Sequence, residues 1–178
     1  MHPRATLRGR VVGRGDENGI PHAEIRALVL EDVKPGGIVL HCTSSDDGSF
    51  ALPVPVASAD KPVLVNLRAR AKGYAPSGLL GASIQGDAVT PAYTLIRLAR
   101  GRRLILNLVD RETGRTPAHA EVLAGTRPIF FAFRTSSDES GRAIIDDFPP
   151  CKSVYVVVQG GEWVLDTTHQ RNVTSTES

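Results

Sequence analysis

The sequence predicts an all-β protein: two Greek-key β-sandwich modules in tandem, with little or no helix. Two observations predict this fold class. Apolar and polar residues alternate in short runs that Gly, Pro, Asp and Asn clusters separate, and one series of turn motifs occurs twice along the chain. Helices are not expected, because no long segment keeps apolar residues at helical spacing without an interrupting Gly or Pro.

The strands are predicted from this alternation. In the clearest run, residues 62–72, Val65 and Leu67 fall on one face while Arg68 and Arg70 fall on the other, which is typical of a strand with one buried face. A last, weaker strand is expected at residues 163–168. Similar clear runs cover residues 7–12, 23–30, 38–44, 49–54, 103–109, 129–135 and 153–159.

The repeated turn motifs predict two modules. The first half contains Gly19-Ile-Pro21-His-Ala23 and later Thr43-Ser-Ser-Asp-Asp-Gly48. The second half contains Gly114-Arg-Thr-Pro117-Ala-His-Ala120, with one inserted residue before the Pro and one after it, and Thr135-Ser-Ser-Asp-Glu-Ser-Gly141, with one inserted residue. Gly gives a turn its backbone freedom, and Pro fixes φ as the chain leaves it. The Asp-rich stretches predict tight connections between paired antiparallel strands.

A module boundary is expected near Arg100–Gly101. The modules then cover residues 1–100 and 101–172, and residues 173–178 form a polar tail that we expect to be mobile. A chain of 178 residues can form two domains of about 90 residues, each large enough for a hydrophobic core.

Composition narrows the possible partners. Hydrophobic residues make up 41% of the chain and charged residues 22%, as in ordinary globular proteins. The formal charge of +2 is too small for the broad positive field of a nucleic-acid-binding protein, so no nucleic-acid partner is expected. No stretch approaches the ~18 apolar residues of a membrane span, so no membrane insertion is expected, and the N-terminal residues lack the apolar core of a secretory signal.

The order of the motifs resembles the carboxypeptidase regulatory-like domain, which belongs to the transthyretin-like, or prealbumin-like, group of seven-stranded sandwiches. In the second module Ala143 replaces the aromatic residue of the pattern, and Gly160-Gly-Glu-Trp163 stands where Gly-Tyr is expected. The resemblance implies a transthyretin-like or Ig-like sandwich and a role as an accessory, spacer or binding module, often exported or in the cell envelope, and it implies no chemistry. In the first module it depends on Gly19, Pro21, Ala23, Thr43, Asp46, Gly48, Phe50, Gly73 and Tyr74.

Enzymes with related sandwiches have requirements that this sequence does not meet. The hydroxyisourate hydrolases end in Tyr-Arg-Gly-Ser, whereas this chain ends in Thr174-Ser-Thr-Glu-Ser178. Intradiol dioxygenases bind iron with two Tyr and two His, and no His pairs at a recognisable spacing with Tyr74, Tyr93 or Tyr155. No catalytic, cofactor-binding or metal-binding residue is therefore predicted.

Several polar residues suggest a site but have simpler explanations. His22 and His119 stand beside similar turns without a second ligand nearby, so loop histidines are expected. The two cysteines, Cys42 and Cys151, fall in different modules and form no disulfide framework. Four arginines at the boundary are expected to be solvated linker charges: Arg97, Arg100, Arg102 and Arg103. Three acidic pairs could offer oxygens to calcium, although Asp also favours turns by itself: Asp46–Asp47, Asp138–Glu139 and Asp146–Asp147.

Two aromatic residues, Phe130 and Trp163, are the candidate ligand contacts. Phe131 and Phe133 share a strand face and are expected in the second core, which leaves Phe130 outside it. The preferred hypothesis is a non-catalytic structural or interaction module, a spacer or accessory binding domain of a larger exported or envelope-associated system, with a protein or glycan partner. The alternatives are a carbohydrate- or peptide-binding module that uses loop tips or a sheet edge, and a metal-dependent enzyme with a site between the modules.

Overall fold

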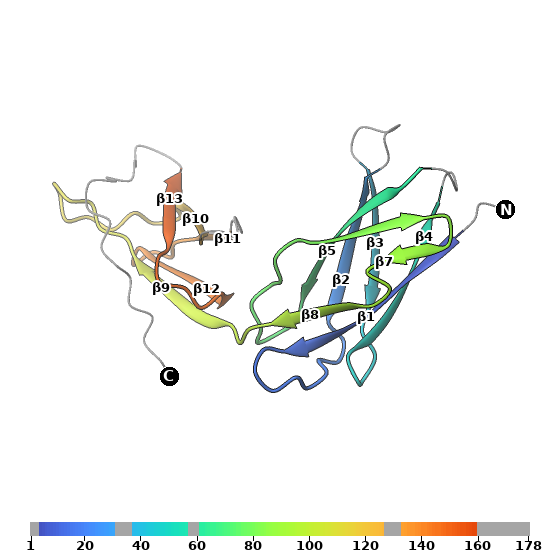
Figure 1. Cartoon of the computed structure of the whole chain (residues 1–178). Coiled ribbons are helices and arrows are strands. Elements are labelled where there is room, and N and C mark those ends of the chain that lie inside the picture. Colours follow the sequence, from blue (N-terminus) through green and yellow to red (C-terminus); the bar gives the residue numbers. More distant parts are fainter. Residues whose placement is uncertain (1–3, 31–36, 57–60, 127–132, 160–178) are drawn as a thin grey trace. The chain divides into compact units, whose positions relative to one another are not determined.

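The protein is all-β, as the sequence predicts (Figure 1). The computed structural model describes residues 4–30, 37–56, 61–126 and 133–159, which contain the strands β1 to β13 and no helix. No helix that could cross a membrane therefore occurs in these four segments. The chain divides into two compact units, Met1–Arg100 and Gly101–Ser178, which are called the first and the second unit below.

The first unit is a sandwich of two sheets. Neighbouring strands are antiparallel except β1 and β8, which pair in parallel. The smaller sheet has the order β4-β1-β8 and consists of β4 (Ser49–Pro55), β1 (Arg4–Gly13) and β8 (Thr94–Leu98). The larger sheet has the order β3-β2-β5-β6-β7 and consists of β3 (Ile38–Thr43), β2 (Glu24–Leu30), β5 (Val63–Arg70), β6 (Leu80–Gln85) and β7 (Ala88–Thr90).

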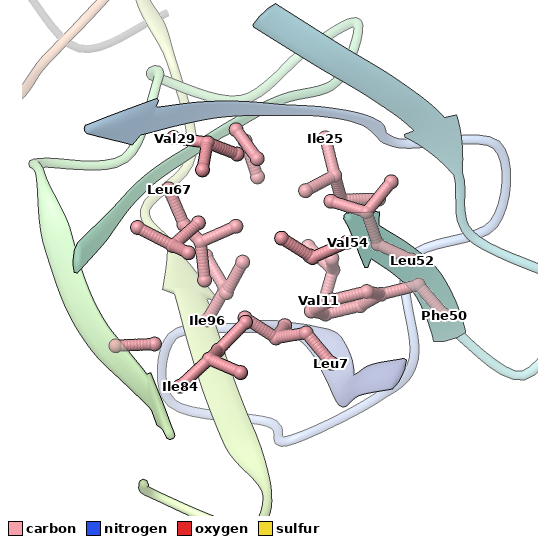
Figure 2. Packing of buried hydrophobic residues seen from close by; sticks show 14 of the residues in the cluster. Leu7, Val11, Ile25, Val29, Phe50, Leu52, Val54, Leu67, Ile84 and Ile96 are labelled. Carbon is pink, nitrogen blue, oxygen red and sulfur yellow. The ribbon is translucent and has the colours of Figure 1, made fainter. Parts of the chain in front are cut away.

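The core of the first unit lies between these sheets (Figure 2). Leu7 and Val11 of the smaller sheet and Ile25 and Leu67 of the larger sheet are fully buried and point into the same space. Each is one of the alternating residues that face inward along its strand, so the pleat itself delivers the apolar side chains to one interior. Burying such a side chain contributes about 1.5–3 kcal/mol.

The second unit is a smaller sandwich in the described residues. Its core includes Leu104, Val122 and Ile145, and Phe148 packs against Phe133 with ring centroids 4.9 Å apart. Phe133 thus lies in the second core, as expected. One sheet has the order β11-β10-β13 and consists of β11 (Phe133–Ser136), β10 (Glu121–Gly125) and β13 (Tyr155–Gln159); the other pairs β12 (Arg142–Phe148) with β9 (Arg102–Asn107).

The two Asp-rich turns do not connect paired strands, which corrects the hairpin prediction. The turn between Ser45 and Gly48 leads from β3, which pairs with β2, to β4, which pairs with β1. The turn between Asp138 and Gly141 leads in the same way from the sheet of β11 to that of β12. Both glycines have positive φ, 83° and 75°, so the chain reverses sharply while it crosses between sheets.

A buried serine holds each of these crossings. Ser44 is 2% exposed, and its Oγ accepts a hydrogen bond from the N–H of Ala23 at 2.8 Å and donates one to the carbonyl of Ile20 at 2.7 Å. The N–H of Ser44 also donates to the carbonyl of Ala23. The serine therefore satisfies backbone groups of the segment that enters β2, which would otherwise be buried without partners.

The second unit repeats these bonds. Ser137 is 2% exposed, and its Oγ accepts from the N–H of Ala120 at 3.0 Å and donates to the carbonyl of Pro117 at 2.6 Å. Ser137 thus corresponds to Ser44, and Pro117 corresponds to Ile20. The comparison of the two motifs by sequence paired Pro117 with Pro21, and this was wrong by one position. It matched the two prolines by residue type, whereas the residue whose carbonyl accepts the serine bond is Ile20 in the first unit and Pro117 in the second.

Candidate functional site

The two predicted contact residues are not among the residues that the structure describes. Phe130 and Trp163 both lie outside the described residues, as do the predicted strand at residues 163–168 and the predicted tail. They therefore stay predictions, and the candidate site is built from other residues.

The two histidines occupy turn positions with left-handed backbones. His22 has φ of 54° and His119 has φ of 57°, a conformation in which His is enriched. The side chain of His22 is 79% exposed, and its Nε2 lies 3.6 Å from Oδ1 of Asp46. No group of three or more His, Cys, Asp or Glu side chains comes together in the part of the chain that the structure describes.

The aspartates of the two acidic turns accept hydrogen bonds from other residues of the same turn. Hydrogen bonds from Ser49 lower the pKa of Asp47. Asp138 Oδ1 accepts hydrogen bonds from the hydroxyl and the N–H of Ser140 and from the N–H of Arg142, and these bonds lower its pKa. These oxygens act as local acceptors in turns, which is the alternative to calcium that the sequence offered.

The boundary arginines are not a free basic cluster. In the first unit Arg97 bonds Glu17 at 2.8 Å, and the guanidinium of Arg100 lies 4.4 Å from the ring centroid of Tyr74. In the second unit Arg103 bonds Asp146 at 2.7 Å. The prediction of linker charges was therefore wrong for Arg97 and Arg103, which lie in β8 and β9, although both side chains are solvated, at 50% and 65% exposed.

Both cysteines are free thiols. Each is half-buried, and this burial raises the pKa of Cys42 and of Cys151. A raised pKa lowers the thiolate fraction at neutral pH, which opposes nucleophilic chemistry. Neither cysteine is therefore a candidate nucleophile.

The candidate site is the outer face of the first unit, defined as the side of the five-stranded sheet that points away from the core. It exists because β2, β3 and β5 alternate, so that every second side chain leaves the core for this face. Soluble proteins usually cover such a face with polar residues. Here large apolar side chains are exposed on it: Leu30 (41%), Val39 (39%), Leu64 (56%) and, just before β6, Leu79 (57%).

The register of the strands places these residues in rows. Leu30 pairs with Leu64 across β2 and β5, and Leu28 pairs with Val39 across β2 and β3. Directly opposed side chains on one sheet face lie about 4.5–5.5 Å apart at Cβ, so they touch. Leu28, Leu30, Leu64 and Val39 thus form a continuous apolar area of two rows, and Leu79 lines the groove beside it.

A groove runs beside this apolar area. It encloses about 260 Å³ and is lined by Arg26, Leu28, Asn66, Arg68 and Leu79. Leu28 pairs with Asn66, and Arg26 pairs with Arg68. The groove is therefore bounded by one row with an apolar and a polar side chain and by one row with two cations. In a binding site, charged groups orient the bound molecule and apolar walls bury part of its surface. This groove has both kinds of group, as binding sites usually do.

Glu24 and Arg70 form the next row of the outer face, and they form an ion pair with each other. Arg70 Nη2 lies 2.7 Å from Oε2 of Glu24, and Nδ1 of His41 lies 3.7 Å from the other carboxylate oxygen of Glu24. Glu24 thus bonds Arg70 of its own row and lies near His41, which belongs to the row of Arg26.

The sequence contained a signal for this face that alternation alone did not use. Leu28-Val29-Leu30 and Val63-Leu64-Val65 are unbroken apolar triplets, whereas a strand with one wet face needs only every second residue to be apolar. The middle residue Val29 is buried, so Leu28 and Leu30 must share the opposite face.

Comparison with known proteins does not assign a family. No family profile matches the chain, and no curated protein matches it. Similar solved structures include the shaft pilin SpaA of Lactobacillus rhamnosus GG, at a TM-score of 0.42 and 11% identity over 90% of this chain and 89% of that chain. A Streptococcal ancillary pilin has a TM-score of 0.39 and 12% identity over 98% of this chain and 59% of that chain. A DUF3823 family protein from Parabacteroides merdae has a TM-score of 0.34 and 13% identity over 89% and 92% of the two chains. These values are too low to carry an argument about function.

Proposed function

We propose that this protein is a non-catalytic interaction module that binds a protein partner on the outer face of the first unit. The observation that carries the proposal is the continuous apolar area on a solvent-facing sheet. Leu64 and Leu79 are each more than half exposed, and an exposed apolar area beside charged residues is typical of protein-binding surfaces.

The two units are, in this proposal, two copies of one carboxypeptidase regulatory-like module from an exported or envelope-associated protein. Three features support the common origin. The units share the buried serine bonds of Ser44 and Ser137, the left-handed histidines His22 and His119, and the crossing of the chain between sheets at the Asp-rich turn. The compartment follows from the family resemblance alone.

Selection of peptides from a random library tests the binding face. A phage-displayed library of peptides of about twelve residues is panned on the whole chain, because an extended segment of that length can span a sheet face. Binders are expected to be lost from the double variant Leu64→Thr/Leu79→Ser. The matched control is Ile105→Thr/Ile144→Thr. These two residues of the second unit are cross-strand partners, and they are 40% and 39% exposed.

The control should retain all binders. Selected peptides that bind both double variants equally well would show that the outer face is not the site. If no peptide is selected and a glycan array gives signals that the Leu64→Thr/Leu79→Ser variant loses, the carbohydrate-binding alternative replaces this proposal.

A spacer role is a second candidate, favoured by the short link between the units. Only residues 99–101 separate β8 from β9. Within the first unit the carbonyl of Ala99 accepts from the N–H of Ala75, and Arg100 stacks on Tyr74, so little of the link is free to act as a tether.

Distance measurements between spin labels test the spacer role. Labels are attached through Ala51→Cys and Arg142→Cys after both native cysteines are changed to Ser. A narrow distribution of distances between the two labels is expected. Insertion of the four residues Gly-Ser-Gly-Ser after Arg100 should broaden it. An equally broad distribution without the insertion would contradict a spacer role.

A further inference from the structure

We infer that β9 of the second unit accepts one further strand, in parallel and along residues 107–110, from an extended segment of a partner protein with apolar residues at two alternate positions. This site is distinct from the outer face of the first unit and does not depend on the function proposed for that face.

The first argument is the equivalence of β1 and β9. The N–H of Val11 donates to the carbonyl of Gly48 at 2.8 Å, and the N–H of Leu108 donates to the carbonyl of Gly141 at 2.9 Å. The turns that follow agree as well, because in each unit the N–H two residues later donates to a carbonyl five residues further along the chain. Residues 9–13 of the first unit thus correspond to residues 106–110 of the second.

In the first unit these residues have a neighbour on each side. β4 lies on one side of β1, and β8 pairs in parallel with residues 9–13 on the other side (Figure 1). The inward residues Ile96 and Leu98 of β8 are completely buried in the core. Among the described residues of the second unit, β9 pairs with β12 alone. This part of the second unit therefore lacks the apolar side chains that β8 gives to the first core.

The second argument is the exposure of the residues that such a strand covers. Val12 is 1% exposed beside β8, whereas the equivalent Val109 is 62% exposed. Leu108 is half-buried, although the equivalent Val11 is completely buried. Because the turn after each valine closes with an equivalent bond, the difference in exposure follows from the strand beside it.

The facing sheet shows the same opening. Through the register of β13 with β10 and of β5 with β2, Val156 and Val158 correspond to Leu67 and Ala69. Leu67 and Ala69 are buried at 0% and 2% exposed, whereas Val156 and Val158 are only half-buried. The core of the second unit is thus partly exposed between β9 and β13, and burial of apolar side chains there would stabilise a bound strand.

One residue of β9 limits where the added strand begins. In the first unit the carbonyl of Thr94 comes so close to Gly9 that a Cβ on Gly9 would collide with it. Leu106 stands at the position of Gly9, so an added strand pairs only from Asn107 onward. Two apolar residues at alternate positions then fill the open side, as the last two inward residues of β8 do in the first unit.

A protein segment suits this site because a strand edge binds through its backbone. Edge strands present N–H and carbonyl groups that an extended peptide can pair with, and natural edges are often protected by Lys or Pro. The residues Asn107-Leu-Val-Asp110 contain neither. Since the N–H of Leu108 points toward β12, the alternation of the strand directs the N–H of Val109 to the opposite edge.

The test uses the whole ¹⁵N-labelled chain and peptides that copy β8. The probe is Tyr-Thr-Leu-Ile-Arg-Leu-Ala, the sequence of residues 93–99, and the control peptide is Tyr-Thr-Leu-Ser-Arg-Ser-Ala. A short free segment bears the full cost of becoming ordered, so weak binding is expected and is followed by NMR. The probe should shift the amides of residues 107–110, with an affinity at least about tenfold above that of the control peptide, which lacks both apolar side chains.

Two variants of one residue locate the contact. Val109→Pro removes the N–H that points to the open edge, and Pro is tolerated on edge strands, so the unit should stay folded and lose the probe. Val109→Thr keeps the N–H and should bind the probe within about threefold of the unchanged chain, because Thr also suits a strand. Hydrogen exchange of the β9 and β12 amides checks that both variants are folded.

Several outcomes would overturn the inference. They are the absence of shifts at about 1 mM probe, equal binding of the two peptides, and binding that persists in Val109→Pro. Slow exchange of the Val109 amide in the chain alone would show that the chain itself covers this edge. Shifts of residues 107–110 that depend on protein concentration without peptide would identify a second copy of the chain as the donor. All these readouts concern the second unit, so they leave the proposal for the outer face of the first unit unaffected.

Discussion

The two units solve one packing problem in opposite ways. In the first unit Gly9 of β1 is paired with Phe50 of β4, and a Cβ on Gly9 would lie 2.5 Å from Cζ of the Phe50 ring. In the second unit the equivalent pair is Leu106 of β9 and Ala143 of β12. The large residue of the pair thus comes from β4 in the first unit and from β9 in the second, and the other member of each pair is small. Phe50, Leu106 and Ala143 belong to the cores of their units.

This exchange explains the departure of the second unit from the sequence motif. Ala143 stands where the motif has an aromatic residue, which by itself suggests a weaker core. Leu106 supplies apolar volume from the opposite strand, and volume-conserving changes are the ones that cores tolerate best. A motif residue in a sandwich is therefore one half of a pair, and a comparison of units must include its partner.

The largest effect is expected from Phe50→Ala, which leaves the first unit without a large residue in this pair. The cost should be about 3–5 kcal/mol, because Phe50 is only 5% exposed and Gly9 cannot fill the space. Urea denaturation followed by hydrogen exchange and mass spectrometry reports each unit separately within the whole chain. Faster exchange is expected in β1 and β4 and not in β9 and β12.

The double variant Gly9→Leu/Phe50→Ala sharpens this comparison, because it copies the pair of the second unit. We expect no restoration of stability, since a Cβ at position 9 also collides with the backbone carbonyl of Thr94 in β8. Full restoration would mean that the volume of the pair alone determines stability at this position.

A smaller and equal effect is expected when the buried serine of either unit is changed to Ala. Ser44→Ala and Ser137→Ala each leave a buried N–H and a buried carbonyl without their side-chain partner, which should cost about 1–3 kcal/mol. Denaturation with unit-resolved hydrogen exchange measures both. A large difference between the two variants would show that the serines do not have equivalent roles.

The acidic turns should respond to pH in both units. Hydrogen bonds lower the folded pKa of Asp47 and Asp138 below 3.8, so the stabilisation that they give is complete above that value and is lost as pH falls through the lower folded pKa. NMR titration of the Ser49 and Arg142 amides should give midpoints below pH 3.8. Asp138→Asn should abolish the titration seen at Arg142, and persistence would assign it to another group.

The smallest effect is expected on the surface that we propose for binding. Leu64→Thr should change the free energy of unfolding by no more than about 0.5 kcal/mol, because Leu64 is 56% exposed and Thr suits a strand. Thermal denaturation measures this change. A loss of several kcal/mol would mean that Leu64 supports the fold, and that its exposure is not kept for a partner.

Local alternation predicted most strands well and failed where alternation is broken. The predicted run at residues 62–72 corresponds to β5, Val63–Arg70, with strict alternation of burial. The strand β12 was missed because Ile144-Ile145 and Asp146-Asp147 are doublets, and the structure places a bulge there, with φ of 57° at Asp147. No predicted run covers β6, β7, β8 or β10 either, and Gly81 and Gly86 interrupt the pattern at β6 and β7.

The sequence by itself determined the all-β fold class and which side chains share a strand face, because the period of two is a local property of extended backbone. Only the tertiary structure decided that Arg26 lies opposite Arg68 and Leu30 opposite Leu64. Register between strands far apart in the chain depends on which apolar faces pack together, and no short segment contains that information. The candidate binding face is a product of that register.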